Sequence, residues 1–164
     1  MSYPDPRYFG DDGEATSRFR AADTPPELPR PGGGAASFLA TGATTDGRFG
    51  LYRWDMGPAR AGAQPHFHRT MSESFFVLSG QIMLFDGAGW IEAGPGDFDY
   101  VPEGGLHGFR NDSGEAVSML ILFAPGAPRE AYFEGLVEMA EGRWTPTDEE
   151  KRAFFLAHDN IYVE

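Results

Sequence analysis

The chain has 164 residues, no cysteine, and 13 basic against 25 acidic side chains, which gives a net charge of −12. This length fits one domain with one substantial core. An acidic chain repels polyanions, so neither nucleic acid nor an anionic membrane surface is an expected partner. Without cysteine there is no disulfide framework and no thiolate metal site. A small molecule is the expected partner.

Residues 1–36 are rich in proline and glycine and show no sustained apolar period. This composition predicts an extended arm, either a disordered tail or an arm that wraps a partner subunit. The N-terminus lacks a basic region followed by an apolar run, and no stretch approaches the length of a membrane span. We therefore expect a cytoplasmic protein.

Residues 37–125 consist of short apolar runs separated by turn signals such as TDG and NDSGE. This texture is typical of an all-β antiparallel sandwich or barrel. The expected strands are residues 37–42, 48–56, 66–68, 73–79, 81–86, 89–92, 98–101, 106–110 and 116–124.

Residues 126–164 change to helical spacing, and we expect two short helices packed on the barrel. AYFEGLVEMA carries apolar residues at that spacing, and TDEEKRAFFLAH opens with a capping box of Thr147 and Glu150. His158 lies near the end of the second helix, where the helix dipole favours a cation, and it is left out of the site.

Two stretches, PHFHRTMSESFFVLSG at 65–80 and GDFDYVPEGGLHGFRN at 96–111, hold three of the four histidines. His66 and His68 are two residues apart, so on a strand both side chains leave the same face. One such pair is more often an exposed strand face or hydrogen-bonded core histidines than a metal site. Glu73 and His107, together with the dense turn signals of the second stretch, favour a metal site built from all four donors.

These stretches resemble the two signature motifs of the cupin superfamily. The matching positions are His66, His68, Glu73 and Gly80 in the first motif and Gly96, Pro102, Gly104, His107 and Asn111 in the second. One position differs, because the glycine expected six residues before His66 is Arg60, with Gly62 nearby. The resemblance covers residues 37–125. It implies a cupin-type antiparallel β-barrel (jelly roll), a homodimer, and His66, His68, Glu73 and His107 as ligands of one ion.

Three neutral imidazoles and one carboxylate leave a divalent ion with a charge of about +1 and open positions for water, substrate or dioxygen. This set of donors does not distinguish between iron, nickel, manganese, cobalt, copper and zinc.

Apolar residues on four of the expected strands either form the core or line a substrate pocket above the metal. The candidates are Tyr52, Trp54, Met56, Phe75, Phe109, Met119, Ile121 and Phe123. No cluster of arginine or lysine lies on these faces, which disfavours phosphorylated sugars and oxalate and favours a neutral or phenolic substrate. Leu120 and Leu122 point opposite to Ile121, so both faces of the last strand need cover from helices or a partner subunit.

Within the cupins the arrangement resembles the quercetin dioxygenase-like proteins. The resemblance implies a metal-dependent dioxygenase, an oxidoreductase acting on an aromatic or polyphenolic compound. Glu73 would then be the catalytic residue, both ligand and base for the phenolic proton. The alternatives are a non-redox polyketide cyclase or isomerase, and a cupin that binds a metal or small molecule without catalysis.

Overall fold

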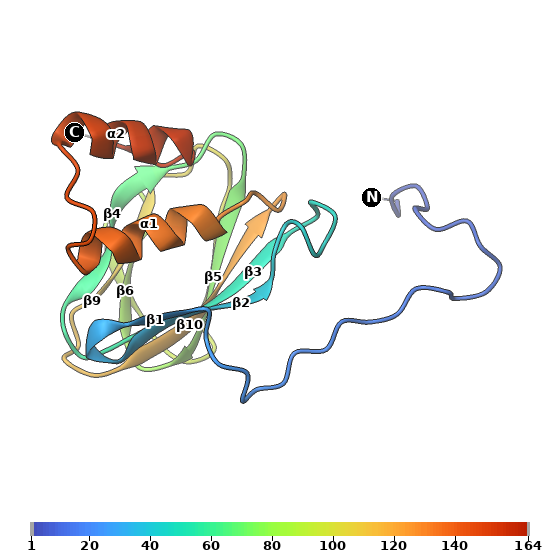
Figure 1. Ribbon diagram of the computed structural model, residues 1–164, viewed down its shortest axis with the longest axis horizontal. Coiled ribbons are helices and arrows are strands. Elements are labelled where there is room, and N and C mark those ends of the chain that lie inside the picture. The colour runs from blue at the N-terminus through green and yellow to red at the C-terminus, as the bar shows by residue number, and fades with distance from the viewer. Residues whose placement is uncertain (1, 164) are drawn as a thin grey trace.

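The structure is a computed structural model that describes residues 2–163 (Figure 1). Two antiparallel sheets face each other and enclose the core. In spatial order the first contains β1 (Leu28–Arg30), β2 (Gly34–Ala40), β3 (Gly50–Met56), β10 (Val117–Ala124), β5 (Ser72–Ser79) and β8 (Phe98–Val101). The second contains β11 (Ile161–Tyr162), β4 (Ala61–Phe67), β9 (His107–Asn111), β6 (Ile82–Phe85) and β7 (Trp90–Ala93). A short 3-10 helix, η1 (Pro31–Gly33), joins β1 to β2.

The predicted all-β architecture with two short terminal helices is confirmed, and the observed strands overlap every expected one. The largest difference is β4, which starts five residues before the expected 66–68. Its register shifts between Ala63 and His66, so Gln64 and Pro65 form an irregularity in the ladder. Proline has no N–H to donate and is tolerated in a strand at such a bulge, which is why the sequence pattern hid this strand.

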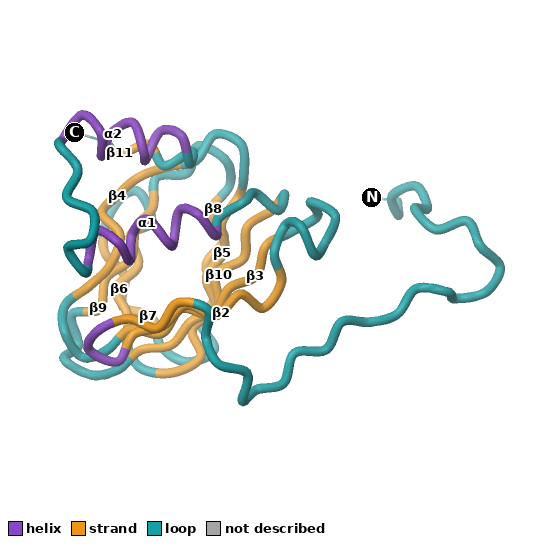
Figure 2. The backbone as a smooth tube through the Cα atoms, in the orientation of Figure 1, coloured by secondary structure: helices purple, strands orange, loops and turns teal. Residues whose placement is uncertain are grey.

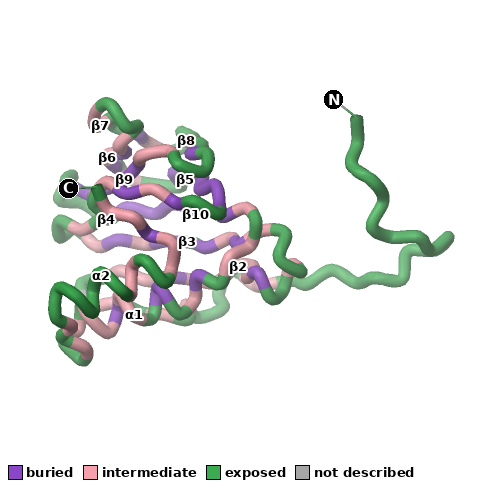
Figure 3. The backbone as a smooth tube through the Cα atoms, turned by 90° about the horizontal axis from the view of Figure 1, so that it is seen from above, coloured by how far each residue is buried: buried purple, intermediate pink, exposed green. Residues whose placement is uncertain are grey.

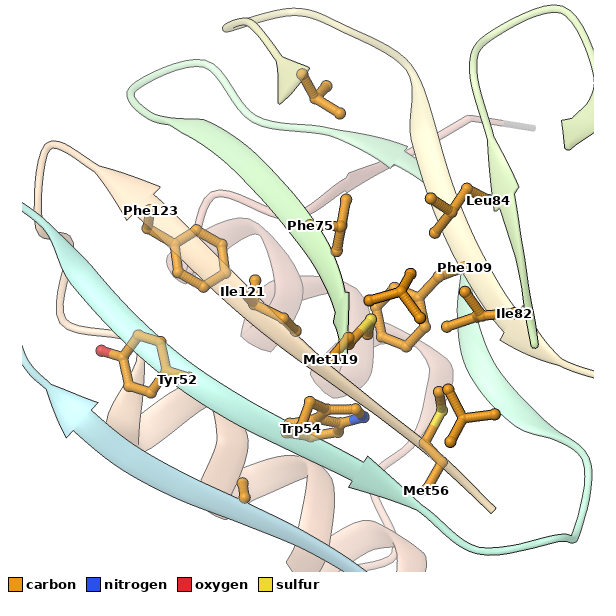
Figure 4. Close-up of a cluster of buried hydrophobic side chains, with 14 of the residues drawn as sticks. Tyr52, Trp54, Met56, Phe75, Ile82, Leu84, Phe109, Met119, Ile121 and Phe123 are labelled. Atoms are coloured by element: carbon orange, nitrogen blue, oxygen red, sulfur yellow. The ribbon is translucent and has the colours of Figure 1, made fainter. Parts of the chain in front are cut away.

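The core lies between the two sheets, and along β3 and most of β10 buried side chains alternate with less buried ones (Figure 4). In β3, Tyr52, Trp54 and Met56 are buried while Arg53 is exposed. In β10 the inward side chains meet those of β3 and β5 in register. Each large apolar side chain that is fully buried stabilises the fold by about 1.5–3 kcal/mol.

Two helices, α1 (Glu130–Ala140) and α2 (Asp148–Ala157), lie on one side of the barrel (Figures 1 and 3). The capping box is confirmed, because Thr147 accepts from Glu150 N at 3.2 Å and Glu150 accepts from Thr147 N at 2.8 Å. The buried face of α1 places Tyr132 and Phe133 against the core. No helix among residues 2–163 is long and apolar enough to cross a membrane.

Residues 2–27 contain no helix or strand and run away from the barrel (Figure 2). Near the barrel Glu27 anchors this segment, pairing with Arg20 at 2.6 Å and accepting from Phe38 N at 2.8 Å. The sheet begins at Leu28, so β1 and the start of β2 lie within the range expected to be arm.

Candidate metal centre

Three strands bring the four expected donors together inside the barrel. His66 lies in β4, His68 just after it, Glu73 in β5 and His107 at the start of β9. His66 faces His107 directly in the β4–β9 register. One donor atom from each of the four residues lies within 4.8 Å of the others, only slightly more than twice a metal bond of about 2.1 Å. All four side chains are buried.

Each imidazole is oriented by a backbone carbonyl on its outer side. Nδ1 of His66 donates to Gln64 O at 2.8 Å, Nδ1 of His68 to Asp159 O at 2.6 Å, and Nδ1 of His107 to Gly105 O at 2.9 Å. A carbonyl can only accept, so each Nδ1 carries the proton and Nε2 is left for the centre. The same arrangement orients histidine ligands in known metal sites.

The carboxylate of Glu73 makes the strongest case for a cation at this point. Its Oε2 lies 2.8 Å from Nε2 of both His68 and His107. With the proton already on Nδ1, a neutral ring would turn the Nε2 lone pair toward a carboxylate oxygen. That contact is repulsive unless a positive charge, either a proton or a metal ion, lies between the atoms. The donor set therefore fits a divalent ion that replaces those protons.

The protonation preferences agree with this geometry. Burial, together with the charge of His107, lowers the pKa of His66 to about 3, so its ring is neutral and its Nε2 is free to bind. Burial alone would raise the pKa of Glu73, but the hydrogen bonds from His107 and His68 outweigh it and hold the pKa well below the ordinary value. Burial opposes charge on His107 too, yet its bond to Glu73 raises the pKa above the ordinary value. The site thus holds a carboxylate that attracts a cation.

The C-terminal segment closes the site from outside. Beyond the carbonyl that orients His68, the Asp159 carboxylate accepts from Arg69 N at 2.9 Å, Thr70 N at 2.8 Å and Thr70 Oγ1 at 2.7 Å. β11 pairs with β4 directly beside His66. The turn of the second stretch contributes as well, because Gly104, at φ +79°, donates its N–H to His68 O at 2.7 Å.

A cavity of about 30 Å³ adjoins His66 and Glu73, and we call it the inner cavity. Of the expected pocket residues, it is lined by Trp54, Phe109, Ile121 and Phe123. A second cavity of about 150 Å³, the outer cavity, is lined by Met56, Trp54 and Phe109 among others. The remaining three, Tyr52, Phe75 and Met119, line neither cavity and belong to the packed core (Figure 4).

The C-terminal segment forms part of the wall of the inner cavity, which the sequence did not predict. The inner cavity is also lined by Ala63, Arg129, Tyr132, Phe133, Leu136 and Asn160. The apolar face of the expected helix could have indicated Tyr132, Phe133 and Leu136. Nothing in the pattern singled out Arg129 or Asn160, because both lie in turns at the ends of the helical segment. The strand faces lack basic residues, but the cavity does not, because Arg129 enters its wall from outside the strands.

The fold and the buried donor set define a small β-barrel protein with a candidate mononuclear metal centre. Residues 52–123 match the family model described as the cupin domain. Over these residues the chain is a cupin domain. It is 30% identical over 123 residues to quercetin 2,3-dioxygenase of Bacillus subtilis (strain 168), and the match covers 75% of this chain. The chain spans only 36% of the length of that relative.

Solved structures support the same fold. The polyketide cyclase RemF of Streptomyces resistomycificus is 25% identical, with a TM-score of 0.54 over 67% of this chain and 80% of that chain. An uncharacterized double-stranded β-helix protein of Klebsiella pneumoniae is 22% identical, with a TM-score of 0.55 over 69% of this chain and 94% of that chain. The second likeness describes the fold alone.

Proposed function

We propose that the protein is a metal-dependent dioxygenase acting on an aromatic or polyphenolic small molecule. His66, His68, Glu73 and His107 would hold one divalent transition metal ion. The observation that carries the proposal is the Oε2 of Glu73, which lies 2.8 Å from two Nε2 atoms in a buried, carbonyl-oriented donor set. The likeness to quercetin 2,3-dioxygenase supports the choice of reaction.

A bound redox-active ion would supply Lewis acidity and electron transfer between substrate and dioxygen. The chain's own residues would exclude water, orient the substrate and accept its proton. Trp54, Phe109 and Phe123 exclude water from the donor set, and Trp54 and Phe109 also line the outer cavity, where they offer aromatic faces to a ring. Glu73 is the base, taking the proton of the substrate hydroxyl onto a carboxylate oxygen. Because this carboxylate is buried, the acquired proton is shielded from bulk water.

A second candidate is a non-redox cyclase or isomerase. The likeness to the polyketide cyclase RemF favours it. In that reaction the same four residues would hold a redox-inert ion that polarises a carbonyl, and Glu73 would move protons between substrate carbons.

Elemental analysis of the purified protein, followed by oxygen-electrode assays on a panel of flavonols and phenols, tests the proposal. We expect iron, nickel, manganese, cobalt or copper at about one ion per chain, with oxygen uptake that depends on substrate. His107→Ala is the control, since it should lose both metal and uptake. Zinc as the only metal, with no oxygen uptake by protein reconstituted with each of the other ions, would refute the dioxygenase and favour the cyclase.

A further inference from the structure

Arg129 is a buried cation beside the metal centre that the proposed chemistry does not yet use. Its side chain is 3% exposed and lines the inner cavity together with His66 and Glu73. It reaches this position because it precedes α1, which crosses the barrel on the side where the helices lie (Figure 1).

Within the described part of the chain, residues 2–163, the guanidinium makes no ion pair. Nη1 donates to His158 O at 2.6 Å and Nη2 to Asn160 Oδ1 at 2.8 Å, and both acceptors are neutral. The Nε–H is buried and finds no hydrogen-bond partner among residues 2–163. An arginine stays protonated in proteins, and a buried unpaired donor costs about 1–3 kcal/mol. Such a donor is suited to an incoming acceptor.

Aromatic rings surround the guanidinium and hold it in place. The Cζ atom lies 4.1 Å from the ring centre of Tyr132, 4.9 Å from that of Phe123 and 5.7 Å from that of Phe133. Asn160 also donates to the Tyr132 hydroxyl at 3.0 Å, so the group that binds Arg129 is itself fixed. The donor is therefore rigid, as a recognition group needs to be.

Charge balance indicates the sign of the missing ligand. Glu73 offsets one of these positive charges, so Arg129 and a divalent ion together leave about +2 among buried side chains. An anionic ligand lowers that cost, and a neutral one does not.

The volumes of the two cavities fit the two parts of an aromatic anion. The inner cavity, at about 30 Å³, has room for a group the size of one water molecule, such as a carboxylate or phenolate oxygen. The outer cavity, at about 150 Å³, has room for a ring. Both are lined by Trp54, Ala63, Phe109, Tyr132 and Leu136, so the two cavities share part of their walls.

We propose that Arg129 is the anion-recognition residue of the substrate site, binding the ionised group of an aromatic carboxylate or phenolate whose ring occupies the outer cavity. This inference rests on the proposed function for the position of the substrate, and it replaces the expected neutral or phenolic substrate by an anionic aromatic one.

Titration calorimetry with benzoate and its neutral analogue benzamide tests this role. On wild-type protein of measured metal content, we expect benzoate to bind at least about tenfold more tightly, as one charge-assisted bond to a buried group predicts. Arg129→Gln should remove that preference, and Arg129→Lys should keep part of it. Because any binding of benzoate to the metal is common to all variants, the difference between wild type and Arg129→Gln isolates the guanidinium.

Arg53→Gln is the matched control, because Arg53 lies on the exposed face of β3 and pairs with Asp55. It should leave benzoate binding unchanged. Benzoate affinity in folded Arg129→Gln within twofold of wild type would overturn the proposal. Equal wild-type affinities for benzoate and benzamide, or no binding of either, would also overturn it, and this measurement needs no variant to fold. If wild-type protein binds benzoate through Arg129 but takes up no oxygen with any substrate, the dioxygenase proposal is refuted and the role of Arg129 stands.

Discussion

Replacing Asp159 by alanine tests how residues around the candidate metal centre support it, because the substitution leaves all four candidate ligands in place. The Asp159 carboxylate holds Arg69 and Thr70, which directly follow His68, through three hydrogen bonds of 2.7–2.9 Å. These groups are near the surface, where water replaces part of each bond, so each contributes about 0.5–1 kcal/mol. The three together contribute about 2 kcal/mol, which corresponds to a loss of about 4–8 °C in Tm for a chain of this size.

The same substitution loosens the Asp159 carbonyl that orients His68 at 2.6 Å. Loss of such an outer partner lowers metal affinity by about 10–100-fold. Because the carbonyl itself remains in Asp159→Ala, we expect a loss of about tenfold, measured by competition with a chelator. Asp159→Asn keeps one acceptor oxygen and should fall between the two proteins in both Tm and metal affinity.

The matched control is Asp46→Ala. Asp46 and Asp159 both have φ +56°, so alanine meets the same left-handed backbone at each position, but Asp46 lies in an exposed turn away from the site. Asp46→Ala should change Tm little and metal affinity not at all. Unchanged metal affinity in Asp159→Ala, despite a lower Tm, would refute the link between the C-terminal segment and the metal centre.

The stability difference between wild type and Asp159→Ala should depend on pH in a defined direction. Burial would raise the pKa of Asp159, but the hydrogen bonds from Thr70 and Arg69 outweigh it and hold the pKa below the ordinary value of 3.8. A carboxyl with a depressed folded-state pKa contributes its stability above its unfolded pKa and loses it as pH falls through the folded one. The difference in Tm between wild type and Asp159→Ala should therefore be constant near neutral pH and shrink below about pH 4.

Four further outcomes are expected. Alanine at His66, His68 or His107 should reduce bound metal well below one ion per chain by elemental analysis, and unchanged content in all three would remove the site assignment. Glu73→Gln should lower turnover by about 100-fold and metal content much less, while equal losses would make Glu73 a ligand only. Thr147→Ala should cost about 1 kcal/mol and 2–4 °C in Tm by calorimetry through loss of the α2 cap; an unchanged Tm would contradict this. Light scattering should find a homodimer, since large side chains on β5 and β8 are exposed, and a monomer would contradict this.

The strand positions could be read from the chain because alternation in β3 and β10 is local. Tyr52, Trp54 and Met56 are buried in the structure as their spacing indicates. β4 was underestimated because Pro65 breaks the local pattern, and its pairing depends on β9, about 40 residues away in the chain. β11 was missed for a similar reason, because two residues carry too little periodicity to be recognised.

The four donors were found because their residue types and spacing are unusual, and the structure brings all four together. The cavity beside them was predicted less well. A strand face that is buried can be core or cavity wall, and the sequence pattern is the same in both cases. The packing of α1 across the barrel determines which of these side chains border a cavity. Tyr52 is therefore packed in the core, whereas Trp54 lines both cavities.

By itself the sequence determined the β-barrel class, the two terminal helices and the four candidate donors, because each follows from local periodicity or from the chemistry of single side chains. Only the tertiary structure determines how the side chains of those donors are oriented. It places Asp159, 91 residues along the chain, against His68, and it buries Arg129 beside Glu73. Neither contact leaves a local pattern, because long-range contacts depend on how the whole barrel closes and not on the residues next to them.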